Sequence, residues 1–159
     1  PGYQVRWRGG YTADYYKLDK NLVRLLKKKR VHVDPTYSLL KTELKPMSEA
    51  QHLAQMELQK QNLLLLKKYK IPVTIGCDSY NLTAKTEIEY LYLLDVYSNL
   101  ELLKMWCETT PQAIFPGRKI GALKDGYEAS FLLLKTDPTA DFKQLFNIQL
   151  RVKQGTLLW

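Results

Sequence analysis

Apolar residues recur at helical spacing in two places in the first half of the chain. Leucines stand three or four residues apart between positions 18 and 26, and Asp19 occupies the position of a helix N-cap. We expect a helix there that ends near Lys29. The capping box formed by Ser48 and Gln51 predicts a second, longer helix. That helix should end near Lys70, because the residue before a proline disfavours helical geometry. Its apolar positions include Leu53, Met56, Leu63 and Leu66.

Two short segments have the pattern of strands. Residues 31–34 (VHVD) alternate and stop at Pro35, and residues 73–75 (VTI) are β-branched throughout, between a proline and a glycine. The order helix, strand, helix, strand predicts an α/β fold with parallel pairing and right-handed crossovers.

Two carboxylates follow these predicted strands. Functional groups of parallel sheets gather at the carboxyl ends of the strands, where Asp34 and Asp78 stand. Asp34 precedes a proline and could equally be a turn residue that bonds its own backbone. Asp78 follows Gly76, which lets the backbone approach closely, and is the better functional candidate.

The second half begins with helix signals and ends with strand signals. We read capping boxes at residues 86–89 and 98–101, core-spaced Leu102, Leu103 and Trp106 in the second of these helices, and a short helix opened by Thr110 and Pro111. Strands are expected at residues 129–134 and 145–152, separated by an Asp-Pro turn at 137–138. Gln154 and Gly155 predict a hairpin turn into residues 156–158.

Composition places the chain among ordinary globular proteins. Its 159 residues, 45% hydrophobic and 25% charged, are enough for one domain with a core, and the apolar runs are short. Since a membrane span needs about 20 apolar residues, no membrane partner is expected. The start at Pro1, without an initiator Met, suggests a cut end.

The net charge of +8 is concentrated between Lys17 and Arg30. A patch of this kind can bind phosphates, but it also fits the solvated face and C-terminal end of an amphipathic helix. Because no base-stacking motif accompanies the patch, the solvated face is the preferred interpretation, and nucleic acid is not expected as a partner.

The cysteines and histidines form no metal or disulfide pattern. Cys77 and Cys107 are expected to be small buried hydrophobes rather than reactive thiols. His32 lies within a predicted strand and His52 near the start of a long helix, so neither is expected to bind metal.

Several motifs occur together in a recognisable order. They are residues 74–79 (TIGCDS), 108–113 (ETTPQA) and 120–126 (IGALKDG), with residues 30–36 (RVHVDPT) ahead of them and Asp137, Pro138, Val152 and Gly155 after them. In this order and spacing the chain resembles the amidohydrolase superfamily, with the imidazolonepropionase-like and Xaa-Pro dipeptidase-like branch as its nearest match. The resemblance covers essentially the whole chain.

The resemblance implies a (β/α)8 barrel with an accessory β-sandwich and one or two divalent metals, commonly zinc. This chain would hold the last two strand–helix units of the barrel in residues 1–117 and C-terminal strands of the sandwich in residues 118–159. Asp78 matches the aspartate of the eighth strand, which binds the metal or its hydroxide and takes the proton of the attacking water. The family's first six strands and histidine ligands have no counterpart here. Ser130 replaces a structural Asp, and Cys77 replaces a Thr.

The first hypothesis is therefore a C-terminal fragment of a metal-dependent hydrolase, inactive by itself. Its parent would cleave an amide or cyclic amide bond in a small-molecule or dipeptide-like substrate. An incomplete barrel exposes an apolar face, so we expect self-association or coverage by the missing N-terminal part. Residues 37–38 and 79–81 could line the substrate pocket or be surface loops. The alternative is a basic binding or scaffold module without catalysis.

Overall fold

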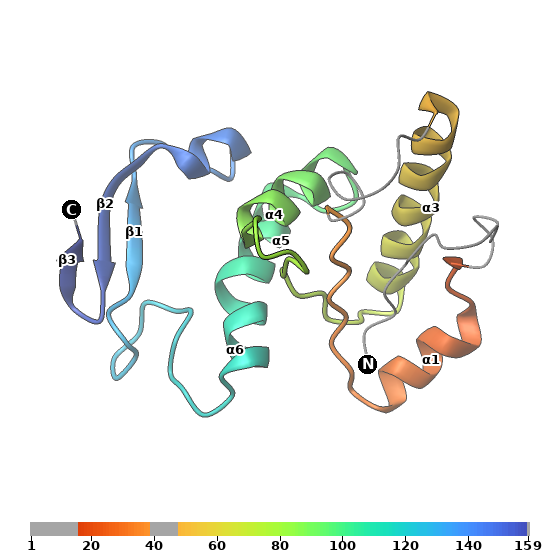
Figure 1. Cartoon of the computed structure of the whole chain (residues 1–159). Coiled ribbons are helices and arrows are strands. Elements are labelled where there is room, and N and C mark those ends of the chain that lie inside the picture. The colour runs from red at the N-terminus through yellow and green to blue at the C-terminus, as the bar shows by residue number, and fades with distance from the viewer. Residues whose placement is uncertain (1–15, 39–47, 159) are drawn as a thin grey trace. The chain divides into compact units, whose positions relative to one another are not determined.

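The computed structural model describes residues 16–38 and 48–158, in two compact units that meet in sequence between Val96 and Tyr97. The predicted cut end at Pro1 lies outside the described residues. The first unit holds helices α1 (Lys20–Lys28), α3 (Glu49–Lys68) and α4 (Ala84–Leu93), and the second holds shorter helices and a small sheet (Figure 1). The fold is α/β, as expected. The predicted division of barrel and sandwich after residue 117 stays a prediction.

The caps that open α1 and α3 are those predicted from the sequence. Oδ1 of Asp19 accepts from the N–H groups of Asn21 at 2.6 Å and Leu22 at 2.8 Å. Ser48 N–H donates to Oε1 of Gln51 at 2.9 Å, and the N–H of Gln51 donates to the Ser48 hydroxyl at 3.3 Å. These bonds satisfy backbone donors that the first helical turn leaves without a partner.

The two predicted strands pair in parallel, but only at Val33 and Val73. Val33 N–H donates to Pro72 O at 2.9 Å, and Thr74 N–H donates back to Val33 O at 2.9 Å. The next donor in a parallel ladder would be residue 35, which is a proline without an N–H. The parallel direction is therefore confirmed, while the predicted full-length strands are reduced to a single bridge.

Helix α4 corrects one predicted cap. The capping box expected at residues 86–89 is wrong, because the helix begins two residues earlier at Ala84, after Thr83. Thr86 lies in the first turn, where its N–H bonds Thr83 O at 2.9 Å. Glu89, the partner that this box would use, lies 3.7 Å from Lys85 instead, and Glu87 is fully buried.

The side of α3 that faces the core of the first unit is partly polar. Leu63 and Leu66 are fully buried, as the helical spacing suggests, but Leu53 is 59% exposed. Gln55, Gln59 and Asn62 are buried instead, at spacings of four and three residues. Such spacing places them on one helix face. This polar stripe was not predicted, because polar residues ordinarily mark the solvent side of a helix.

The second unit opens with three helical segments that follow one another directly: α5 (Asn99–Lys104), a π-helical turn (Met105–Thr109) and α6 (Thr110–Ile114). The capping box of Ser98 and Glu101 is confirmed at 2.8 and 3.3 Å. Pro111 has no N–H to donate to Cys107 O, and the widened turn lies at this point. The short helix at Thr110 is therefore a continuation of the two preceding helical segments, and Leu102 of α5 is fully buried.

An antiparallel sheet ends the chain, in the order β1 (Phe131–Leu134), β2 (Ile148–Lys153) and β3 (Thr156–Leu158) (Figure 1). The hairpin turn predicted at Gln154 and Gly155 is confirmed, with φ of 51° and 78°. β2 starts later than predicted, because residues Phe142–Phe146 form a 3-10 helix that buries Phe142 and Leu145.

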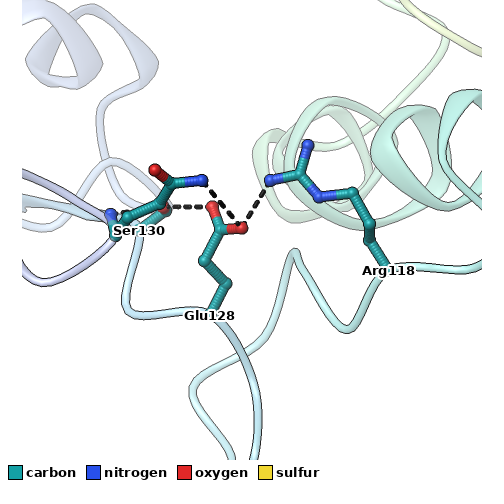
Figure 2. Close-up of polar contacts among 4 residues, drawn as sticks. Arg118, Glu128 and Ser130 are labelled. Atoms are coloured by element: carbon teal, nitrogen blue, oxygen red, sulfur yellow. Dashed lines mark hydrogen bonds and ion pairs between the residues drawn. The ribbon is translucent and has the colours of Figure 1, made fainter.

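A polar cluster joins the loop before β1 to the hairpin turn. Glu128 accepts from Ser130 Oγ at 2.7 Å, from Gln154 Nε2 at 3.5 Å and from Arg118 in a short ion pair (Figure 2). Ser130 Oγ in turn accepts from Gln154 N–H at 3.0 Å. Ser130 therefore takes part in a hydrogen-bond network that holds the local backbone.

Candidate functional site

The two predicted carboxylates lie on neighbouring segments of the first unit. Asp34 follows directly after the bridge residue Val33, and Asp78 follows five residues after Val73. Both side chains are exposed, and they are near enough for the charge of Asp78 to act on Asp34. The structure thus brings together the carboxyl ends that the sequence pattern paired.

The carboxylate of Asp34 is held by backbone N–H groups. It accepts from Gly76 on the neighbouring segment and from Thr36 in its own loop. The interpretation of Asp34 as a turn residue is supported by the contact two residues ahead, and Asp34 also bonds the segment that carries Asp78. Desolvation on its inner side raises the pKa of Asp34, the two N–H donors oppose that rise, and the charge of Asp78 adds to it.

The close approach of the Asp34 carboxylate requires a glycine at position 76. A Cβ at this position would lie 2.8 Å from Asp34 Cγ, closer than real Cβ atoms approach other atoms. The glycine was predicted to permit a close backbone approach, and the group that approaches is the Asp34 carboxylate. An alanine here would push that carboxylate away from the Gly76 N–H.

Glu87 of α4 holds the loop that follows Asp34. Its Oε1 accepts from Tyr37 N–H at 2.9 Å and its Oε2 from Ser38 N–H at 2.7 Å. The loop includes Thr36 at φ 46°, a left-handed conformation that is rare for a β-branched residue. Burial raises the pKa of Glu87, while the N–H groups of Ser38 and Tyr37 oppose the rise. Sequence reasoning missed Glu87 as a site-supporting residue because it assigned residues 86–89 to a cap.

Tyr37 of this loop and Tyr90 of α4 have desolvated hydroxyl groups. Tyr90 Oη donates to Oε1 of Gln59 on α3 at 2.7 Å. Burial raises the pKa of Tyr37 to about 12 and that of Tyr90 to about 12, and the charge of Glu87 contributes to both. Both phenols therefore stay neutral at physiological pH and act as hydrogen-bonding groups rather than as bases.

The loops proposed as pocket-lining segments have different environments. Ser38 is buried and Tyr37 half-buried, whereas Tyr80 is fully exposed. Asn81 N–H donates to Ser79 Oγ at 3.3 Å, which closes a local turn. The first loop therefore faces the interior of the unit, while Tyr80 faces solvent.

The expected burial of the two cysteines is wrong. Cys77 is half-buried and Cys107 exposed. Cys77 lies where the Val73 segment turns outward beside the exposed Asp78. Desolvation around the sulfur still raises the pKa of Cys107, with a smaller contribution from the charge of Glu108, so the thiolate is disfavoured. His32 is exposed and His52 half-buried.

The described residues do not complete a metal site. Within residues 16–38 and 48–158, no three His, Cys, Asp or Glu side chains gather in a group that could hold a metal ion. A zinc site needs three or four ligands.

No helix of the described part combines the length and the apolar character that a membrane span requires.

No protein-family model and no curated protein matches the sequence. Solved structures do match the fold. A candidate prolidase from Bifidobacterium longum superposes over 90% of this chain with a TM-score of 0.72 and 19% identity. A prolidase complexed with N-methylphosphonate-L-proline superposes over 89% of this chain, with a TM-score of 0.67 and 18% identity. An amidohydrolase superposes over 89% of this chain, with a TM-score of 0.64 and 19% identity.

These similarities confirm the resemblance to amidohydrolases at the level of the fold. The chain spans 40% of the candidate prolidase, 38% of the prolidase complex and 37% of the amidohydrolase. It therefore has the fold of one part of an amidohydrolase-like protein.

Proposed function

We propose that this chain is the C-terminal part of a metal-dependent hydrolase that cleaves amide or cyclic amide C–N bonds. Residues 1–117 would supply the last two strand–helix units of its barrel, and residues 118–159 the strands of an accessory β-sandwich. The observation that carries the proposal is the pair of carboxylates, Asp34 and Asp78, at the carboxyl ends of two parallel segments of an amidohydrolase-like fold.

Asp78 would be the catalytic residue that this chain contributes. Its carboxylate is exposed at the segment end and would serve as a ligand and as the acceptor of the proton of the attacking water. A divalent metal, zinc in most of the related family, would lower the pKa of its bound water. Because the remaining ligands would lie in the rest of the parent, this chain alone would be inactive.

The substrate would be a small molecule of dipeptide-like shape. Support comes from the similar prolidase that binds N-methylphosphonate-L-proline. The missing N-terminal part, or a second copy of this chain, would cover apolar side chains that are exposed here. These include Leu123 at 81%, Leu132 at 50%, Leu133 at 48% and Ile114 at 60%.

The test is hydrolysis of Xaa-Pro and acyl-amino-acid substrates by the protein in the full length its gene encodes. Asp78→Asn should lower kcat at least about a hundredfold, since it removes the proton acceptor. Asp95→Asn is the matched control, because Asp95 is also exposed and its φ of 52° suits asparagine. Equal activity of Asp78→Asn and wild type would refute the assignment of Asp78.

A specific observation favours the second candidate, a basic binding module. Lys20, Arg24, Lys27 and Lys28 are exposed on α1, and none of them forms an ion pair with any residue that the structure describes. Their spacing puts them on one face of the helix. Retention of the chain on heparin at about 0.3 M salt, lost when these four residues become glutamine, would support this candidate.

A further inference from the structure

We propose that Asp34 and Glu87 are positioning residues of the candidate site, which form a reciprocal tie between the segment that carries Asp78 and the loop that follows Val33. Asp34 belongs to the first segment and accepts from the backbone of the second, at Gly76. Glu87 belongs to the helix after the second segment and accepts from the backbone of the first, at Tyr37 and Ser38. The catalytic consequence of this tie rests on the proposed function, whereas its structural part does not.

The tie takes over where the strand pairing stops. Among the described residues, the backbone bonds that join the two segments are both at Val33, and Pro35 cannot donate the next one. Beyond that point the two carboxylates link the segments. Hydrogen bonds to charged acceptors are stronger than neutral ones, so the ends of the segments are held by the strongest bonds of the pairing.

Glu87 also supports a strained loop. Thr36 has a φ of 46°, and the two residues after it are those that donate to Glu87. Strained backbone persists only where its surroundings hold it. The full burial of Glu87 excludes water from competing for these donors, so the loop keeps one conformation next to Asp34.

Asp34 in turn fixes the position of the segment that carries Asp78. Its carboxylate bonds Gly76, two residues before Asp78, and fills the space that a Cβ on Gly76 would need. The position of the Asp78 carboxylate thus depends on Asp34, whose own loop depends on Glu87. A displacement of a reacting group by about 1 Å can cost a hundredfold in rate, so the tie matters for catalysis.

Hydrogen exchange on the 159-residue chain tests the Glu87 half of the tie. In Glu87→Gln one carboxylate oxygen becomes an NH2 group that cannot accept from an N–H. Exchange of the amides of residues 36–38 should rise about tenfold or more, because at least one bond to a charged acceptor is lost. Glu89→Gln is the control and should leave exchange unchanged, because Glu89 lies on the same helix and pairs with the exposed Lys85.

A double-mutant cycle tests the Asp34 half. Asp34→Ala should raise exchange of residues 74–78 about tenfold, whereas Asp34→Asn keeps an acceptor oxygen and should stay within about threefold of wild type. Gly76→Ala should match Asp34→Ala when made alone and add little in the Asp34→Ala background, since the new methyl group then displaces no carboxylate. If Asp34→Ala and Glu87→Gln exchange their amide hydrogens at wild-type rates, the tie is overturned. An increase in exchange rate of equal size throughout both units also overturns it.

Kinetics of the full-length protein test the catalytic consequence. Asp34→Ala should lower kcat about tenfold or more with KM changed by less than about twofold, and Asp34→Asn should restore most of kcat. Unchanged kcat in an active enzyme overturns the positioning role. If wild type hydrolyses no amide substrate at all, the proposed function fails, and the exchange measurements still decide whether the tie exists.

Discussion

The carboxylate of Glu87 accepts a 2.7 Å hydrogen bond from the N–H of Ser38, 49 residues earlier in the chain. Both residues have no exposed surface. Replacing Glu87 with alanine leaves this donor and the N–H of Tyr37 buried without a partner, and we expect a loss of roughly 2–4 kcal/mol in the free energy of unfolding. Urea denaturation measures it. Glu89→Ala should change stability by less than about 0.5 kcal/mol, because it removes only an exposed pair.

The same carboxyl group predicts a pH dependence of stability. Burial, the largest cause, raises the pKa of Glu87 above its ordinary value of 4.5. The folded state then binds the proton more tightly than the unfolded state. The stabilisation is complete below the unfolded pKa and is lost as pH rises through the folded pKa. Urea midpoints of wild type should therefore fall relative to those of Glu87→Gln as pH rises from about 4.5.

Asp34 titrates in the same direction, since its pKa is also raised by burial. The comparison must therefore be the difference between wild type and Glu87→Gln, in which the contribution of Asp34 largely cancels. A difference that is constant from pH 4.5 to neutral would contradict the raised pKa of Glu87.

Gly121 should be intolerant of substitution. It has a φ of 81°, and a Cβ there would lie 3.3 Å from the carbonyl carbon of Cys107, whose oxygen receives no bond from Pro111. We expect Gly121→Ala to destabilise the second unit by roughly 1–3 kcal/mol, through strain and contact together. Gly117→Ala is the control, because a methyl group at Gly117 would meet no atom within 4 Å. Thermal unfolding of both variants provides the comparison.

Two of the three helix starts with the pattern of a capping box, at Thr86 and at Ser98, should respond differently. Ser98→Ala removes the acceptor for Glu101 N–H and should cost about 1 kcal/mol. Thr86→Ala should cost nothing or slightly stabilise, since Thr86 lies inside the first turn and alanine is the better helix former. If Thr86→Ala loses as much stability as Ser98→Ala, Thr86 acts as a helix cap after all, contrary to the structure.

The sequence predicted local features well and long-range polar contacts poorly, for a physical reason. The bonds of Asp19, Ser48 and Ser98 join groups two or three residues apart, so the chain encodes them locally. Glu87 lies inside a local Thr-x-x-Glu pattern like that of Ser98 and Glu101, and only its contact with Ser38 shows its actual role. That contact depends on packing across 49 residues, which no local pattern carries.

The predictions about the candidate site divide in the same way between local and long-range features. The proximity of Asp34 and Asp78 could be predicted, because parallel strands deliver their following residues to one edge. The contact between Asp34 and Gly76 was only half predicted: the glycine indicated a close approach, but the approaching group was not identified. The polar stripe of Gln55, Gln59 and Asn62 was missed because its residue types ordinarily indicate solvent.

Ser130 offers a last test, of the polar cluster in the second unit. Its hydroxyl donates to Glu128 at 2.7 Å and accepts from Gln154 N–H at 3.0 Å, which links the start of β1 to the hairpin turn between β2 and β3. Ser130→Ala should raise hydrogen exchange at Gln154 about fivefold to tenfold, because one neutral bond is lost at an exposed site. Ser130→Thr keeps the hydroxyl and is the control. Ser130→Asp should loosen the turn further, since a second carboxylate beside Glu128 repels it and competes for Arg118. Tighter protection in Ser130→Asp than in wild type would contradict this role of the serine hydroxyl.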